Sequence, residues 1–207
     1  GILPALLDDT VVNHEILVLI GEQGLYKTTW FNFLLPPELR CYFYTKTNSD
    51  RLNKDDLFSL TEFALICFEE LDGMRPAELN QLKAMVTMPY VNERAAYGRN
   101  KERHPHIASF CGTGNNVQFL TDPTGNRRWL PFEVSQIRDP HLHAIPYELV
   151  YSQAYALWKS GFCHWFSQEE IRKLNMHNSR FEVPNLEEDL IRTHFRKPFE
   201  GEAGIFV

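Results

Sequence analysis

Short apolar runs alternate with segments of helical spacing along the first two thirds of the chain. The run at 15–20 is continuous and β-branched, which suits a strand buried on both faces of a parallel sheet. Further strands are expected at 41–45, 64–68, 106–112 and 127–134, and helices at 28–35, 54–60 and 76–86. This alternation predicts an α/β fold around a central, mainly parallel sheet.

The last third of the chain changes character, because three helical patterns follow one another without an intervening strand. These patterns cover 147–160, 167–175 and 186–195. Ser167 and Glu170 have the spacing of a capping box, which supports a helix start at that point. We therefore expect an α/β core over residues 1–140 and a helical C-terminal extension over 141–207.

The stretch GEQGLYKTTW at 21–30 nearly matches the phosphate-binding loop G-x-x-x-x-G-K-[ST]. It lies between a predicted strand and a predicted helix, as the motif requires, but Tyr26 stands in the place of the second glycine. The loop binds phosphate chiefly through backbone N–H groups, so Tyr26 keeps its donor; a positive φ there would cost about 1–2 kcal/mol. We expect a functional ATP site formed by Gly21, Gln23, Gly24, Tyr26, Lys27, Thr28 and Thr29.

Two adjacent glutamates, Glu69 and Glu70, follow the predicted strand at 64–68. The carboxyl ends of the strands of an open α/β sheet border its ligand crevice. ATP hydrolysis needs an acid there for Mg²⁺ and a carboxylate that orients or deprotonates the attacking water. The pair can supply both functions; the alternative is a strand end with solvated acids.

Polar residues also follow the strand at 106–112 and precede the one at 127–134. An amide such as Asn115 can hydrogen-bond the γ-phosphate or the attacking water, although the sequence T-G-N-N is also typical of a turn. Arg127 and Arg128 lead from a turn into the last strand. Arginine suits phosphate because its planar fork donates two hydrogen bonds, and a structural salt bridge is the alternative.

The segment 94–106 concentrates basic residues in a chain whose formal net charge is -6. Basic residues beside an aromatic ring form a surface that follows a nucleic-acid backbone and stacks bases, so the segment predicts single-strand binding. A solvated hairpin with scattered charges is the alternative. The candidate contacts in this segment are Arg94, Tyr97, Arg99, Lys101 and Arg103.

The 207 residues suffice for one hydrophobic core. The four cysteines include no C-x-x-C pair, and three lie in apolar stretches that suggest buried thiols, so a reducing cytoplasm is expected. No run approaches the roughly 20 apolar residues that span a bilayer, so we expect no membrane contact. Because the chain begins with Gly1, we expect it to be a fragment of a longer protein.

In order, five segments resemble the virulence-associated protein E family, P-loop ATPases of phage and mobile elements that are related to superfamily 3 helicases. The segments are GEQGLYKTT, CFEEL, LKAMVTMPYVNERAAYGR, SFCGTGNN and DPTGNRRW, and the resemblance runs from about Val12 to Phe195. It implies a P-loop NTPase of the ASCE or AAA+ type that uses ATP and Mg²⁺. It also implies work on single-stranded or forked DNA and a homo-oligomeric ring of the full-length protein.

The resemblance also implies a role for each matching residue. Lys27 corresponds to the phosphate-loop lysine, and Thr28 to the magnesium-binding hydroxyl. Glu69 and Glu70 correspond to the second acidic motif, in which we expect Glu69 at Mg²⁺ and Glu70 at the attacking water. Asn115 corresponds to the sensor asparagine, and Arg127 and Arg128 to the pair before the last strand. Because the related helicases hydrolyse ATP between subunits, we expect Arg127 or Arg128 to complete a neighbouring subunit's site. Lys83 lies in the segment that carries DNA-contacting loops.

These features predict a helicase-like ATPase that couples ATP hydrolysis to work on DNA during replication of a mobile element. One alternative is a DNA-binding or initiator scaffold that is gated by nucleotide and hardly hydrolyses it. A small-molecule kinase is disfavoured, because adjacent acids followed by an asparagine suit activation of water better than binding of an acceptor.

Overall fold

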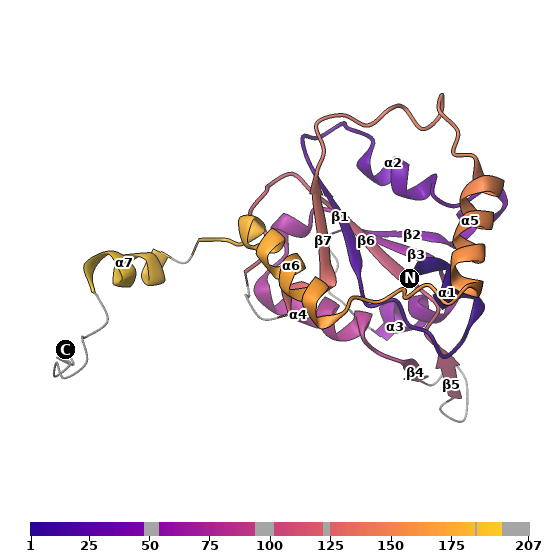
Figure 1. The fold of residues 1–207 in the computed structure, drawn as a ribbon, viewed down its shortest axis with the longest axis horizontal. Coiled ribbons are helices and arrows are strands. Elements are labelled where there is room, and N and C mark those ends of the chain that lie inside the picture. Colours follow the sequence, from indigo (N-terminus) through magenta and orange to yellow (C-terminus); the bar gives the residue numbers. More distant parts are fainter. Residues whose placement is uncertain (48–53, 94–101, 122–124, 185, 196–207) are drawn as a thin grey trace.

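The computed structural model describes residues 1–47, 54–93, 102–121, 125–184 and 186–195 (Figure 1). The strands are β1 (Ile16–Ile20), β2 (Phe43–Lys46), β3 (Leu65–Phe68), β4 (Tyr90–Glu93), β5 (Glu102–Pro105), β6 (Ser109–Gly114) and β7 (Trp129–Glu133). The α-helices are α1 (Ile2–Leu7), α2 (Lys27–Asn32), α3 (Lys54–Glu62), α4 (Pro76–Val86), α5 (Tyr147–Lys159), α6 (Gln168–Asn178) and α7 (Leu186–His194). Short 3-10 helices are η1 (Pro37–Tyr42), η2 (Leu71–Gly73), η3 (Asn126–Arg128) and η4 (Ser179–Phe181).

Five strands form the central sheet in the order β2-β3-β6-β1-β7, and every pairing in it is parallel. The predicted α/β fold with a parallel sheet is therefore confirmed. All five strands end at the same edge, which we call the carboxyl edge; the opposite one is the amino edge. The strand β6 lies between β1 and β3, so the segments that follow these three strands are neighbours at the carboxyl edge.

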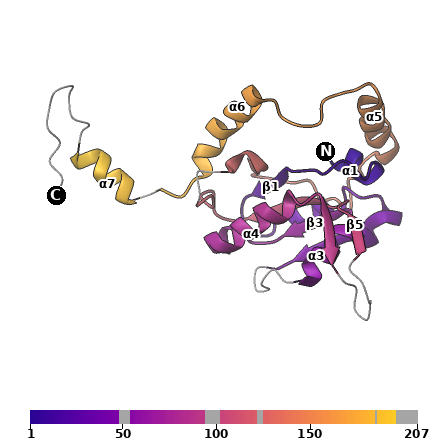
Figure 2. The same cartoon turned by 90° about the horizontal axis from the view of Figure 1, so that it is seen from below.

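Helices cover both faces of the sheet because alternate residues of the buried strands point to opposite sides. Ile16, Val18 and Ile20 of β1 pack in a core cluster with residues of α3 and α4. Leu17 and Leu19 belong to a second cluster, which includes residues of α1 and α2. Figure 2 shows α3 and α4 on one side of the sheet and α1 and α5 on the other.

The C-terminal helices differ in how closely they join this core. Phe181, which follows α6, is buried in the first cluster, and the side chain of Asn178 donates to the carbonyl oxygens of Asn126 (2.7 Å) and Trp129 (2.9 Å). The helix α5 has no buried residue. It meets the chain after α2 through the hydroxyls of Tyr147 and Tyr151, which donate to the carbonyl oxygens of Phe33 and Leu34 at 2.7 and 2.8 Å.

Figure 1 shows α7 extending away from the rest of the chain.

The predicted capping box of α6 is present, since the Ser167 hydroxyl accepts from the Glu170 backbone N–H (3.3 Å) and the Glu170 carboxylate accepts from the Ser167 N–H (2.8 Å). The boundary at 140/141 stays a prediction.

Several details differ from the expectations. The short helix α1 was not predicted, and the antiparallel hairpin β4–β5 was expected only as the alternative for the segment 94–106. Two of the four cysteines, Cys67 and Cys111, are buried, whereas Cys41 and Cys163 are exposed, so the expectation of three buried thiols was wrong. Cys41 lies within η1 and Cys163 follows α5, and neither helix contains a buried residue. Among the described helices, none combines the length and apolarity that a bilayer crossing needs.

Candidate functional site

The loop 21–26 leaves β1 at the carboxyl edge and enters α2, which is the strand–loop–helix setting that the sequence predicted. Its first residue is held at the sheet, because the Gly21 N–H donates to the Gly114 carbonyl oxygen at the end of β6 (3.1 Å). A side chain at Gly21 would lie 2.3 Å from the carbonyl oxygen of Val134, so only glycine fits there. Gly24 has a φ of 87°, which a glycine adopts without strain.

Tyr26 adopts the left-handed conformation, with φ 58° and ψ 20°. The phosphate-loop motif has glycine at this position, and the backbone keeps the positive φ although the residue has changed. The side chain is 44% exposed, and the tyrosine borders the pocket described below. A positive φ at Tyr26, which was expected to cost about 1–2 kcal/mol, is therefore present in the structure.

Lys27 is buried at the start of α2 and its ammonium group turns back into the loop. The Nζ atom donates to the carbonyl oxygens of Gly21 (2.6 Å) and Glu22 (2.7 Å) and to Oδ1 of Asn115 (3.2 Å). Burial lowers the pKa of Lys27 from its ordinary value, and the negative charge of Asp72 opposes that shift. The lysine therefore sits where loop carbonyls and one amide surround it.

The adjacent glutamates take different positions. Glu69 accepts a hydrogen bond from the Thr28 hydroxyl, with 2.7 Å between Oγ1 and Oε1. Glu70 precedes η2 in the left-handed conformation, with φ 54° and ψ 47°. Glu70 and Tyr26 are the residues other than glycine with positive φ among the described part of the chain, and both border the same pocket. Strained backbone of this kind is concentrated at functional sites.

Asn115 follows β6 and brings the third strand end into the site. Its side chain contacts Lys27, as above, while its backbone N–H donates to Oδ1 of Asp72 (3.2 Å). The next N–H, that of Asn116, donates to the other oxygen of Asp72 (3.1 Å). Asp72 was not among the predicted site residues, although it stands two positions after Glu70 in the FEELD segment.

A pocket of about 320 Å³ opens at this edge of the sheet. The structure brings together most of the residues that the sequence predicted around ATP and Mg²⁺. The lining residues are Gln23, Gly24, Leu25, Tyr26, Lys27, Thr28, Thr29, Glu69, Glu70, Thr113 and Asn115. The phosphate loop, the two glutamates and Asn115 thus line one pocket, although up to about ninety positions separate them in the sequence.

Arg127 and Arg128 lie elsewhere, at the amino edge. They precede β7, whose first residue, Trp129, is paired with Ile16 at the start of β1, so the length of β1 separates them from the loop. A cavity of about 530 Å³ beside them is also lined by Lys83, Asn80 and Asn175. Burial and the neighbouring charge of Arg127 lower the pKa of Arg128, and its Nε is buried without a hydrogen-bond partner among the described residues.

The two predicted DNA-binding residues that the structure describes, Lys83 and Arg103, lie on different elements. Lys83 is buried on α4 and borders the arginine cavity, whereas Arg103 lies on β5 of the small hairpin. The Arg103 guanidinium lies 3.8 Å from the centre of the Tyr90 ring. Arg94, Tyr97, Arg99 and Lys101 lie outside the described residues. Among the candidates on the basic segment 94–106, Arg103 is the one that the structure describes, and it is exposed.

The profile of the virulence-associated protein E-like domain matches residues 7–183. The chain belongs to this family. The VapE-like match covers the loop, both glutamates, Asn115 and the two arginines, and it confirms the family that the sequence resembles. No curated protein matches the chain significantly.

The VapE-like domain is also similar to two solved structures. One is the apo structure of the NrS-1 C-terminal region (305-718), with 13% identity and a TM-score of 0.49 over 86% of this chain and 38% of that one. The other is the A form apo structure of the same region, with 12% identity and a TM-score of 0.47 over 87% and 37%. The chain thus spans well under half of those regions.

Proposed function

We propose that this VapE-like domain is a P-loop ATPase of the ASCE or AAA+ type, related to superfamily 3 helicases, that couples ATP hydrolysis to work on DNA in the replication of a mobile element. The observation that carries the proposal is the pocket at the carboxyl edge, where Lys27, Thr28, Glu69, Glu70 and Asn115 meet. The strand order supports it, because β6 separates the loop-bearing strand from the acid-bearing one and adds an amide between them.

Each side chain suits one part of ATP hydrolysis. Lys27 supplies a positive charge to the β- and γ-phosphates, and the loop supplies backbone N–H groups. Glu70 orients or deprotonates the attacking water, since it borders the pocket and is not the glutamate bonded to Thr28. Asn115 donates its amide N–H groups to the γ-phosphate or to that water.

The donor set at Thr28 and Glu69 fits Mg²⁺. The hydroxyl and carboxylate oxygens lie 2.7 Å apart at the pocket, and Mg²⁺ prefers one or two such oxygens together with phosphates and water. When bound, the ion neutralises charge that develops on the phosphates. Thr28 and Glu69 would hold the ion, and the Thr28 hydroxyl could do so through a lone pair while its proton still donates to Glu69.

A scaffold that binds ATP and hardly hydrolyses it is the alternative. The pocket favours it in one respect, because Lys27 is the one cation among the described residues that line it, while Arg127 and Arg128 lie at the amino edge. Rapid turnover with single-stranded DNA supports the helicase-like ATPase, and tight binding with negligible turnover supports the scaffold.

The decisive experiment compares the wild-type domain with Lys27→Ala in ATP binding and in steady-state phosphate release, with and without single-stranded DNA. We expect the variant to lose binding or turnover by about 10-fold to 100-fold or more, because a charged hydrogen-bond donor to phosphate contributes about 1.5–3 kcal/mol. Lys173→Ala is the matched control, since Lys173 is 71% exposed on α6. Unchanged turnover in Lys27→Ala would overturn the proposal, and phosphate release without any acceptor excludes the kinase.

A further inference from the structure

Asp72 lies outside the pocket and yet joins two of the strand ends that form it. It sits in η2, directly after the acidic pair at the end of β3, and its two carboxylate oxygens accept the backbone N–H groups of Asn115 and Asn116 at 3.2 and 3.1 Å. Asp72 is not among the residues that line the pocket. It therefore contacts the chain after β6 and not the volume in which a nucleotide would lie.

The contact is closely fitted. A Cβ added at Gly114 would lie 3.0 Å from Oδ1 of Asp72 and 2.9 Å from a side-chain carbon of Ile20, so the carboxylate lies directly against the backbone. The two N–H groups that it accepts belong to consecutive residues, and a two-point contact of this kind fixes the orientation of the peptide between them. That peptide begins at Asn115.

The fixed backbone in turn sets the direction of the Asn115 side chain. The Oδ1 atom of Asn115 accepts from Nζ of Lys27 at 3.2 Å. Lys27 begins α2, which follows β1, the second neighbour of β6 in the sheet. A connected path thus runs from Asp72 through the backbone and side chain of Asn115 to Lys27. The charge of Asp72 is also the one that opposes the effect of burial on Lys27.

We propose that Asp72 is a positioning residue of the nucleotide site, which holds the backbone at 115–116 so that the Asn115 amide faces Lys27 and the γ-phosphate. The inference rests on the proposed ATPase function for its kinetic consequences. It assigns Asp72 no contact with nucleotide, metal or water. Its effect on hydrolysis is exerted through Asn115.

A double-mutant cycle tests this path. Asp72→Ala and Asn115→Ala are each expected to slow single-turnover ATP hydrolysis about tenfold or more, and the double variant is expected to be no slower than Asn115→Ala. ATP affinity should change less than threefold in Asp72→Ala. Rates that multiply in the double variant would overturn the proposal, because Asp72 would then act independently of Asn115.

Asp139→Ala is the matched control, since that carboxylate accepts the His141 backbone N–H at 2.9 Å in an exposed loop far along the chain. It should leave hydrolysis unchanged. Should Asp72→Ala fail to fold, Asp72→Asn keeps one acceptor oxygen and takes its place in the cycle.

Amide hydrogen exchange in the nucleotide-free protein gives a readout that needs no activity. Asp72→Ala should speed exchange of the Asn115 and Asn116 amides at least tenfold relative to wild type, while amides in α5 and α6 keep their rates. Unchanged exchange at 115–116 would overturn the positioning role even in an active enzyme. If the wild-type domain hydrolyses no ATP but exchange changes as expected, the proposed function fails and the structural role of Asp72 stands.

Discussion

The two edges of the central sheet present opposite kinds of polar chemistry. At the carboxyl edge, Lys27, Thr28, Glu69, Asp72 and Asn115 satisfy one another through hydrogen bonds within a single chain. The larger amino-edge cavity has arginine and lysine in its wall and, among the described residues, no carboxylate. A smaller cavity that the arginines also line includes Glu15. The carboxyl edge, where the polar groups hydrogen-bond one another within one chain, and the larger cationic cavity, which has no described carboxylate in its wall, suggest different ligands. We expect a nucleotide at the first and an anionic group from outside this chain at the second.

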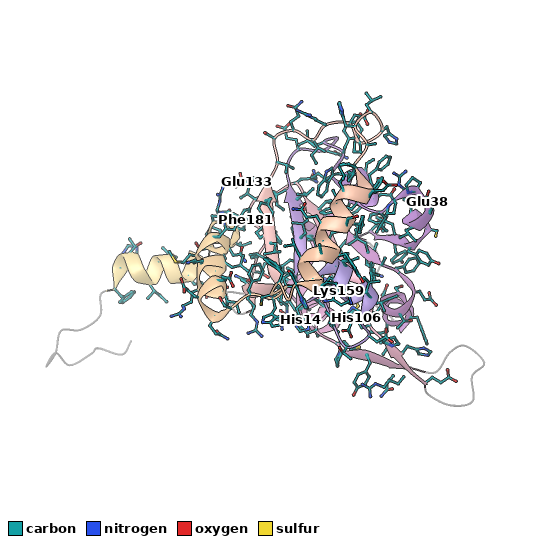
Figure 3. The ribbon with its side chains drawn as sticks, turned by 45° about the vertical axis from the view of Figure 1, so that its right-hand side comes forward. His14, Glu38, His106, Glu133, Lys159 and Phe181 are labelled. Carbon is teal, nitrogen blue, oxygen red and sulfur yellow. The ribbon has the colours of Figure 1, made fainter. Side chains whose placement is uncertain are left out.

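Figure 3 marks the two edges of the sheet: Glu133, at the end of β7, lies at one, and His14 and His106 lie at the opposite one. Because the arginines lie at the amino edge, they cannot reach the phosphate loop of their own chain. A sensor role at the nucleotide of their own chain does not fit this distance, and a role at a neighbouring subunit's site stays a prediction.

The largest expected effect tests whether the amino edge serves a neighbour. The Arg127→Ala, Arg128→Ala double variant should lose ATP turnover by about 10³–10⁵-fold in the full-length assembly, the range known for arginine fingers. Mixed with Lys27→Ala protein, which is also inactive, it should regain part of the activity, since some intact loops then face intact arginines. Phosphate release by the mixture is the measurement.

The matched control for the arginines is Arg138→Ala with Arg172→Ala, two basic residues outside both cavities. That variant should keep its activity alone and in mixtures. No recovery in oligomers shown to contain both variants would mean that the arginines have a structural role beside Trp129.

The next effect separates the two glutamates of the carboxyl edge. Glu70→Gln should keep ATP binding and slow hydrolysis by about 10²–10⁴-fold, the usual contribution of a general base. Glu69→Gln should mainly weaken magnesium-dependent binding, because Glu69 is the partner of the Thr28 hydroxyl. Nucleotide affinity measured with and without Mg²⁺, together with single-turnover rates, distinguishes them; equal and mild effects would contradict both roles. The exposed Glu62→Gln is the control.

A smaller effect concerns strain in the loop. Tyr26→Gly should bind ATP equally well or up to about tenfold tighter and should raise the free energy of unfolding by about 1 kcal/mol, because glycine tolerates the positive φ. Isothermal titration and denaturant unfolding measure the two quantities. Tyr42→Gly, which removes a similarly exposed ring outside the left-handed region, should instead destabilise the fold. A large loss of ATP affinity in a folded Tyr26→Gly would show that the ring itself binds nucleotide.

The smallest effect belongs to the amino edge. His106 is fully buried before β6, its Nδ1 lies 2.6 Å from the Met88 carbonyl oxygen, and burial lowers its pKa. The unfolded chain therefore binds a proton at His106 more readily than the folded chain does. The contribution of neutral His106 to stability is present above pH 6.5, and it is lost as the pH falls toward the pKa of His106 in the folded chain. One proton limits the slope to about 1.4 kcal/mol per pH unit.

Denaturant unfolding between pH 7.5 and 5 should show a shallower pH dependence in His106→Gln than in wild type. The exposed His143→Gln should match the wild-type slope. Parallel pH profiles for wild type and His106→Gln would contradict the contribution of His106.

Much of the fold was predictable because buried parallel strands are continuous apolar runs, and all five runs form the sheet. The hairpin was expected only as an alternative, because its strands, YVNE and ERHP, are four residues long and mostly polar. Lys27, Thr28, Glu69, Glu70 and Asn115 were predictable because their side-chain chemistry is the signal. Asp72 was not, because its role is a backbone contact across more than forty residues. The position of the arginines could have been predicted, since residues that precede a parallel strand lie at its amino end.

The tyrosine hydroxyls of α5 have a mechanical consequence. The helix α2 is about 9 Å long, at 1.5 Å per residue. The phosphate loop precedes its first residue, and the hydroxyls of Tyr147 and Tyr151 donate to the carbonyl oxygens just after its last residue. The helix α5 also contacts α1, and Arg40 donates to the Tyr147 hydroxyl at 3.1 Å. The position of α2 is therefore fixed at both ends, by the sheet through the phosphate loop and by α5 through the two tyrosines.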